Sequence, residues 1–156
     1  MKARTILASL VVVLVGVALG FAADADLTKY MGTWKLNEAQ SKFGPGAGKN
    51  TTVMYAPAGD NQVKVTTDGV DKDGKPTHTE WTGKFDGKDY PVTGTTEYDT
   101  RSYAPAAEHA LTMTIKKGGQ TVATGKISVS RDGKSRTVTT TGSAPSMNNT
   151  AVYDKQ

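Results

Sequence analysis

The amino-acid sequence predicts an all-β protein, a single antiparallel up-and-down β-barrel of about 8–10 strands with one short helical turn near the N-terminus. Three observations predict this fold. Apolar and polar residues alternate in short segments, as they do in strands with one buried face. Pairs of turn-forming residues separate these segments at intervals of about 8–14 residues. No long segment repeats its apolar residues with the period of an α-helix.

The first 25 residues have the composition of an export signal. Lys2 and Arg4 make a positive start, residues 6–19 form a mostly apolar run, and small residues follow up to Ala25. An uncleaved membrane anchor is the alternative, because residues 6–23 are just long enough to span a bilayer.

Cleavage after Ala22 or after Ala25 satisfies the preference for small residues around the cleavage site. We therefore expect residues 1–25 to be a signal peptide and residues 26–156 to be the β-barrel domain. The mature protein is expected to be periplasmic or secreted, with no stable membrane anchor after cleavage.

The charge of the chain does not indicate nucleic-acid binding. The formal charge is +4, and removal of the signal peptide takes away the basic residues Lys2 and Arg4. The mature chain is therefore almost neutral, and its aromatic residues do not cluster with Lys and Arg as a nucleic-acid surface requires. The chain has no cysteine, which excludes disulfides and thiolate metal sites.

The elements after the signal peptide follow from local pattern. The first predicted strand places Trp34 and Leu36 on its inward face. Asn37 is expected to cap one short helical turn that ends at Ser41. The glycine-rich segment 44–48 predicts a mobile loop without regular structure.

Four further strands follow from the same alternation. Their expected inward residues are Val53 and Tyr55, then Val63 and Val65, then Trp81, Gly83 and Phe85, and finally Leu111, Met113 and Ile115. Turn chemistry predicts hairpins between strands, because certain residue pairs tolerate positive φ. These pairs are Asp60-Asn61, Asp73-Gly74, Asp86-Gly87, Gly118-Gly119 and Asp132-Gly133. Five hairpins imply about ten strands.

A change of parity predicts an irregularity late in the chain. Val122 and Ile127 cannot share an inward face in a regular strand, because the side-chain period is two. We expect a β-bulge at Gly125. A strand bent in this way favours a closed barrel over a sandwich, and closure also removes the exposed edges of the sheet.

Several segments of the chain are similar to those of one family. They are Gly-Thr-Trp-Lys-Leu-Asn at 32–37, Ser-Lys-Phe at 41–43, Asp-Gly-Lys-Asp-Tyr-Pro-Val-Thr-Gly at 86–94, Ser-Arg-Asp-Gly-Lys at 130–134 and Val-Tyr-Asp-Lys at 152–155. In these segments the chain resembles small exported bacterial lipocalin-like (calycin-like) proteins of unassigned function. The resemblance implies an up-and-down barrel with Trp34 at its closed end and the basic residue Lys155 across that tryptophan. It implies no activity, and the second turn motif of lipocalins is missing.

No catalytic or metal-binding motif is complete in the sequence. There is no Gly-x-Ser-x-Gly nucleophile elbow. His78 and Glu80 lie on one strand face, but a metal site would need a third ligand, and we interpret them as exposed polar residues. A catalytic barrel that uses His78, Glu80 or Tyr90 is the enzymatic alternative. We expect no enzyme activity, no catalytic residue, no metal and no cofactor.

The predicted function is binding of a small hydrophobic ligand inside the barrel. The residues expected to line the cavity are Trp34, Tyr55, Val65, Trp81, Phe85, Leu111, Met113 and Ile115. The alternative is a structural or interaction protein of the cell envelope, in which the same residues form a filled core without a ligand. The sequence leaves the identity of the ligand and the oligomeric state open.

Overall fold

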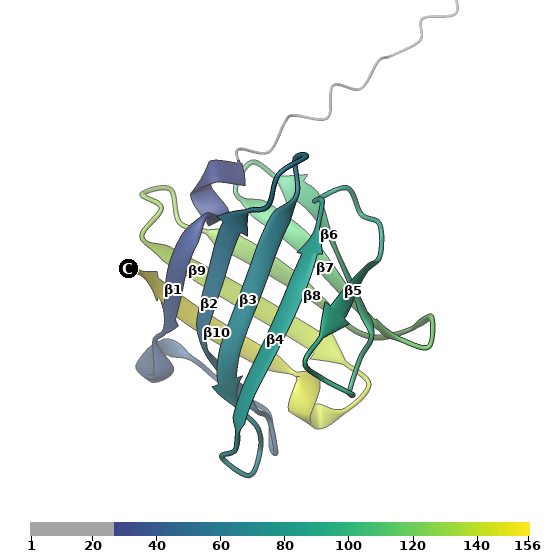
Figure 1. The fold of residues 1–156 in the computed structure, drawn as a ribbon. Helices are drawn as coiled ribbons and strands as arrows, with labels where there is room; N and C mark the ends of the chain where they lie inside the picture. The colour runs from purple at the N-terminus through teal and green to yellow at the C-terminus, as the bar shows by residue number, and fades with distance from the viewer. Residues whose placement is uncertain (1–26) are drawn as a thin grey trace, which may run out of the picture.

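The structure of this protein, a computed structural model, describes residues 27–156. Ten β-strands form one closed barrel in which neighbouring strands are antiparallel (Figure 1). Strands consecutive in the chain lie side by side, and the first pairs with the last to close the wall. The predicted all-β up-and-down barrel is confirmed. The predicted signal peptide, residues 1–25, lies outside the described residues.

The elements are ten strands and three short 3-10 helices. In chain order they are η1 (Leu27–Tyr30), β1 (Gly32–Leu36), η2 (Glu38–Gln40), β2 (Lys49–Pro57), β3 (Val63–Val70), β4 (Pro76–Gly83), β5 (Tyr90–Thr93), β6 (Thr100–Ala107), β7 (Ala110–Lys117), β8 (Gln120–Val129), β9 (Ser135–Gly142), η3 (Pro145–Met147) and β10 (Asn149–Lys155). No helix among the described residues is both long enough and apolar enough to cross a membrane.

The predicted turns lie where the sequence places them. Asp60 and Asn61 connect β2 and β3 with φ values of 48° and 58°, the left-handed conformation that a tight turn requires. The predicted helical turn is η2, and the side chain of Asn37 accepts a hydrogen bond of 3.3 Å from the backbone N–H of Gln40. The segment 44–48 contains no helix or strand.

The expected β-bulge is in β8, but its predicted position at Gly125 is wrong. The register of β8 against β7 passes from Ala123 directly to Thr121, so the extra residue is Val122. Gly125 itself pairs regularly with both neighbouring strands. A Cβ at this position would lie 2.9 Å from Cε of Met113, the flexible end of that side chain, and 3.0 Å from the backbone oxygen of Thr139.

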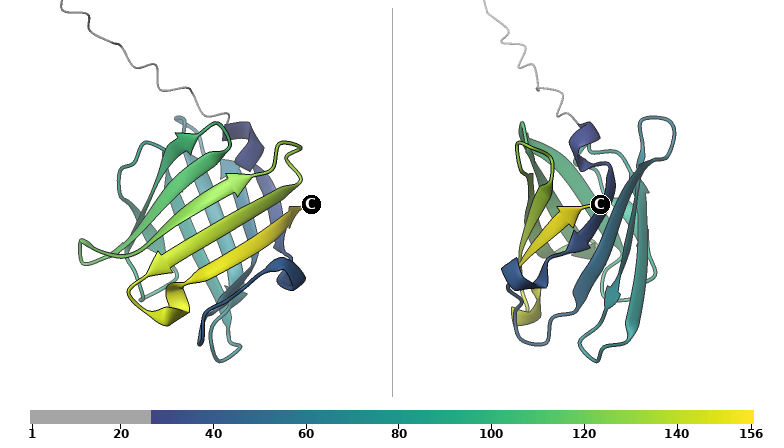
Figure 2. Two further views of the ribbon diagram at one scale, coloured as in Figure 1. Left: turned by 180° about the vertical axis from the view of Figure 1, so that it is seen from behind. Right: turned by 90° about the vertical axis from the view of Figure 1, so that its left-hand side faces the viewer.

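The two ends of the barrel differ. At one end η1 lies over the opening, close to the β2–β3 and β8–β9 turns (Figures 1 and 2). At the opposite end lie η2, the β3–β4 turn and η3. The hydrophobic core lies between the strands, and the largest fully buried side chains within residues 27–156 come from η1 and from strands all round the wall. These are Trp34, Trp81, Arg136, Tyr30, Tyr103, Leu111, Ile127 and Val65.

Candidate functional site

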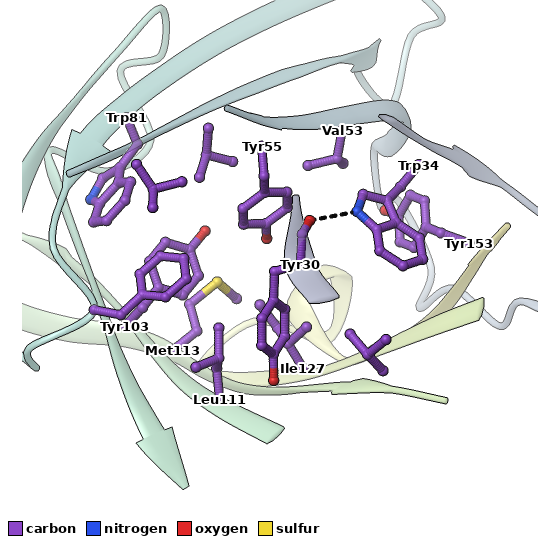
Figure 3. Close-up of a cluster of buried hydrophobic side chains, with 14 of the residues drawn as sticks. Tyr30, Trp34, Val53, Tyr55, Trp81, Tyr103, Leu111, Met113, Ile127 and Tyr153 are labelled. Atoms are coloured by element: carbon purple, nitrogen blue, oxygen red, sulfur yellow. Dashed lines mark hydrogen bonds between the residues drawn. The ribbon is translucent and has the colours of Figure 1, made fainter. Parts of the chain in front are cut away.

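Seven of the eight residues predicted to line the interior are buried in the core. They come from β1, β2, β3, β4 and β7, and Phe85 follows two residues after the end of β4. Figure 3 shows the side chains of Trp34, Tyr55, Trp81, Leu111 and Met113 in the interior. The exposed fractions are 0% for Trp34, 3% for Tyr55, 1% for Val65, 1% for Trp81, 8% for Phe85, 0% for Leu111 and 7% for Met113. Ile115, the eighth, is partly buried and packs against this core.

Aromatic side chains dominate one side of the interior. The rings of Trp81 and Tyr103 meet edge to face, with centroids 4.8 Å apart. Phe85 lies 5.4 Å from Tyr103 and stacks on Trp81 at 6.0 Å. Edge-to-face and offset contacts of this kind stabilise beyond the burial of surface alone. The indole N–H of Trp81 donates to the backbone oxygen of Arg101 at 2.8 Å, which fixes the ring to β6.

Trp34 marks the end of the barrel that η1 covers. Its indole N–H donates a 2.9 Å hydrogen bond to the backbone oxygen of Tyr30, the last residue of η1 (Figure 3). The ammonium of Lys155 lies 5.2 Å from the ring centre of Trp34, so the contact that the lipocalin-like resemblance implies is present. A second cation, Arg136, lies 5.3 Å from the same ring.

The side chain of Tyr30 closes this end from within. It is fully buried among side chains of the wall, and its hydroxyl has no hydrogen-bond partner among the described residues (Figure 3). Burial raises the pKa of Tyr30 to about 12, so the hydroxyl is neutral at physiological pH. The preceding residue, Lys29, contacts Nδ1 of His109 at 3.0 Å and ties η1 to the β6–β7 turn. η1 is therefore anchored by its backbone and by two side chains.

The opposite end of the interior is not sealed. In β9 the alternation that turns Arg136 inward also turns Val138 and Thr140 inward, yet both are only partly buried. Ile115 of β7 is likewise inward-facing and partly buried. Solvent therefore reaches the inner wall from the end opposite η1.

Arg101 and Arg136 lie inside the barrel, although the sequence analysis did not predict either of them there. Arg101 on β6 is 7% exposed and Arg136 on β9 is 2% exposed. Strand alternation was the available signal. Arg101 lies two residues before Tyr103 and Arg136 two residues before Val138, so each pair shares one face of its strand. Charged residues are rarely buried without a partner, so hydrophobicity alone assigns them to the outer face.

His78 and Glu80 lie on the outer wall, whereas Tyr90 pairs in register with the inward-facing Arg101 and its ring packs edge to face on Trp81 at 5.7 Å. His78 is more than half exposed, with Nδ1 2.6 Å from Asp68 and Nε2 3.6 Å from Glu80. The hydrogen bond to Asp68 raises the pKa of His78, and Glu80 adds to this effect. The hydroxyl of Tyr90 donates to Asp86 at 2.9 Å. Within residues 27–156 no cluster of three or more metal-ligating side chains is present.

Two of the open depressions on residues 27–156 lie outside the core. One, of about 300 Å³, is at the rim opposite η1 and is lined by Lys42, Phe43, Gly44, Thr139, Thr140, Asn148, Asn149 and Thr150. The other, of about 440 Å³, follows β7, β8 and β9 and is lined by Thr112, Met113, Thr114, Thr124, Gly125, Lys126, Thr139 and Thr141. Most residues of the second are threonines on the outward side of their strands, so it belongs to the outer wall.

No protein-family model matches the chain, and a comparison with curated proteins gives no match. Among solved structures the chain is similar to a redesigned β-barrel, mFAP1, bound to DFHBI, with 13% identity, a TM-score of 0.49 and coverage of 84% of this chain and 99% of that one. It is also similar to a de novo designed fluorescence-activating β-barrel, with 12% identity, a TM-score of 0.48 and coverage of 85% of this chain and 98% of the designed one. Similarities this low say nothing about a ligand of this chain.

Proposed function

We propose that this protein is an exported lipocalin-like barrel, periplasmic or secreted, that binds a small and largely apolar ligand in its interior without transforming it. The observation that carries the proposal is the partial exposure of Ile115, Val138 and Thr140, which face inward near the unsealed end. A wall of aromatic and aliphatic side chains, covered at one end and reachable from the other, suits a small-molecule site. The export signal and the resemblance to lipocalin-like proteins support the same proposal.

A first experiment looks for the natural ligand. The protein is purified from a host that exports it, analysed by native mass spectrometry, and extracted with organic solvent. We expect a stoichiometric, largely apolar compound that raises the melting temperature of the extracted protein when it is added back. The proposal would be contradicted by a native mass equal to that of the protein alone, with no extractable compound and no stabilisation by a panel of lipids and aromatic compounds.

A second experiment tests the location with matched variants. Thr140 faces inward and Thr139, its neighbour on β9, is exposed. Thr140→Trp should fill the unsealed end and weaken binding of the neutral fluorescent probe N-phenyl-1-naphthylamine, whereas Thr139→Trp should bind it as the unmodified protein does. Equal binding by both variants would place the probe outside the barrel.

The second candidate function is a structural or interaction protein of the cell envelope with a filled barrel. The depression on the outer wall favours it, because a row of threonine hydroxyls beside Lys126 is a surface on which another macromolecule can form hydrogen bonds. This candidate predicts no bound compound and no binding of the neutral probe. The two experiments above therefore separate it from the ligand-binding barrel.

A further inference from the structure

Among residues 27–156, the buried charged side chains are two arginines, with no buried carboxylate. Arg101 and Arg136 are both more than nine-tenths buried. Within residues 27–156 neither guanidinium has a carboxylate within the 4.0 Å of an ion pair. A buried charge without a counter-charge costs several kcal/mol, so an arrangement of this kind needs a reason.

Arg101 is held by neutral groups. Its Nη2 donates to the hydroxyl of Tyr98 at 2.9 Å, and its Nη1 donates to the hydroxyl of Tyr103 at 3.1 Å. Its Nε–H has no hydrogen-bond partner within residues 27–156. Burial raises the pKa of Tyr103, more than the nearby arginine charges lower it, so this hydroxyl stays protonated. The tyrosines therefore accept hydrogen bonds from Arg101 but supply no negative charge.

Arg136 is surrounded by ring faces. Its guanidinium carbon lies 5.3 Å from the ring centre of Trp34, 5.1 Å from that of Tyr55 and 4.6 Å from that of Tyr153. These cation–π contacts offset part of the cost of burial. They leave the Nε and Nη1 donors of Arg136 without a hydrogen-bond partner in the part of the chain that the structure describes.

The two arginines act on the same region of the interior. The charges of both reach Tyr103, where they lower the pKa against the larger effect of burial. Tyr55 contacts Arg136 through its ring and also interacts electrostatically with Arg101. Arg101 pairs in register with Ile115, one of the partly buried residues of the unsealed end. An anion entering from that end meets Arg101, with Arg136 behind it.

We propose that the buried guanidinium groups of Arg101 and Arg136 bind the negatively charged head group of the ligand, and that the ligand is a small amphipathic anion such as a medium-chain alkyl carboxylate. This inference rests on the interior site proposed above. The anion accepts hydrogen bonds from the unpartnered Nε–H of Arg101 and N–H groups of Arg136, which are strong because donor and acceptor are both charged. The apolar part lies against the aromatic and aliphatic wall.

Displacement of the neutral probe N-phenyl-1-naphthylamine tests the head group on the unmodified protein. The competitors share one ten-carbon chain and differ in charge: decanoate, decyl sulfate, 1-decanol and decyltrimethylammonium at pH 7.5. We expect decanoate and decyl sulfate to displace the probe at concentrations at least about tenfold lower than decanol and the cation. Displacement by decanol at the same concentration as decanoate would overturn the inference and leave the interior site standing. Failure of the probe itself to bind would overturn the proposed function.

Variants then assign the effect to the two arginines. In Arg101→Met and Arg136→Met, the advantage of decanoate over decanol should fall to within about twofold, while decanol binding is kept. Arg131→Met is the matched control, because Arg131 is exposed in the turn between β8 and β9 and its loss should leave the advantage intact. Persistence of the advantage in both interior variants would overturn the assignment. If a variant does not fold, the head-group series on the unmodified protein decides the question without it.

Discussion

The guanidinium carbon of Arg136 lies 4.6 Å from the ring centre of Tyr153, its register partner on the neighbouring strand β10. The side chains of Trp34 on β1 and Tyr55 on β2 complete the surroundings of this cation. The pairing between β1 and β10 closes the barrel, with β1 and β2 on one side of it and β10 on the other. One buried cation therefore contacts aromatic rings on both sides of this closure. The contact links the charge in the interior to the closure of the wall.

Replacement of Arg136 separates its packing from its charge. Arg136→Ala should lower the free energy of unfolding by about 2–4 kcal/mol, because it leaves a cavity among three rings. Arg136→Met keeps most of the volume and removes an unpaired buried charge, so its effect should stay within about 1 kcal/mol. Urea unfolding of both variants measures the difference. An equally large loss in both would show that the charge, and not the volume, stabilises the fold.

Trp34→Phe should weaken the anchoring of η1. The variant loses the hydrogen bond to the backbone oxygen of Tyr30, with an expected cost of about 1–3 kcal/mol in urea unfolding. Amide hydrogen exchange of Met31, whose N–H is bonded to the oxygen of Thr28, should become faster. Trp81→Phe is the control, because it loses a comparable bond whose acceptor is the backbone oxygen of Arg101 on β6 and not a residue of η1. Equal acceleration at Met31 in both variants would refute the specific anchoring.

Two glycines with positive φ distinguish backbone strain from close approach. Gly133 has φ of 68° and open space around the position of a Cβ. Gly94 has φ of 87°, and a Cβ there would overlap the backbone oxygen of His78 on β4. Gly133→Ala should cost about 1–2 kcal/mol for the left-handed conformation alone. Gly94→Ala should cost clearly more in the same urea measurement, and equal costs would argue against the close approach.

The pKa of His78 should lie above the ordinary value of a histidine. Its hydrogen bond to Asp68 is the largest cause of the raised pKa, so Asp68→Asn should lower the NMR midpoint more than Glu80→Gln does. Because the folded-state pKa is raised, the stabilisation is fully present below the unfolded value near 6.5 and is lost as pH rises through the folded value. A larger shift in the Glu80 variant would contradict this ranking.

Alkaline pH should destabilise the protein through its buried tyrosines. Burial raises the pKa of Tyr30 from 10.0 to about 12. The folded state therefore holds this proton more tightly than the unfolded state, and the resulting stabilisation is present below pH 10 and lost between pH 10 and 12. Urea unfolding at several alkaline pH values measures the loss, and Tyr30→Phe should reduce it. An unchanged loss in this variant would assign the effect to other tyrosines.

The local elements of the barrel were predictable because short-range pattern decides them. The alternation around Trp34, Val65 and Leu111 identifies inward faces, and those side chains are 0–1% exposed. Residues that tolerate positive φ mark the turns, as Asp60 and Asn61 do between β2 and β3. Both signals act between neighbours in the chain, so no tertiary contact is needed to interpret them.

The position of the bulge was not predictable in the same way. The alternation of inward and outward side chains requires one extra residue in the segment from Val122 to Ile127, but it does not say which residue this is. Glycine is common at β-bulges, so the sequence favours Gly125 as the extra residue. Pairing with β7 decides for Val122, whereas a Cβ at Gly125 would come close to the side chain of Met113 and to the backbone oxygen of Thr139. Both facts depend on the neighbouring strands.

By itself the sequence determined the fold class, the turns and most of the buried wall, because alternation and turn chemistry are local properties of the chain. Only the tertiary structure decided that Arg101 and Arg136 lie inside the barrel. Strand alternation allows both arginines to face inward, but burying a charge costs free energy. Whether the charge is buried depends on the groups that surround the cation. Those groups, such as Tyr55 and Trp34 around Arg136, come from strands far apart in the sequence.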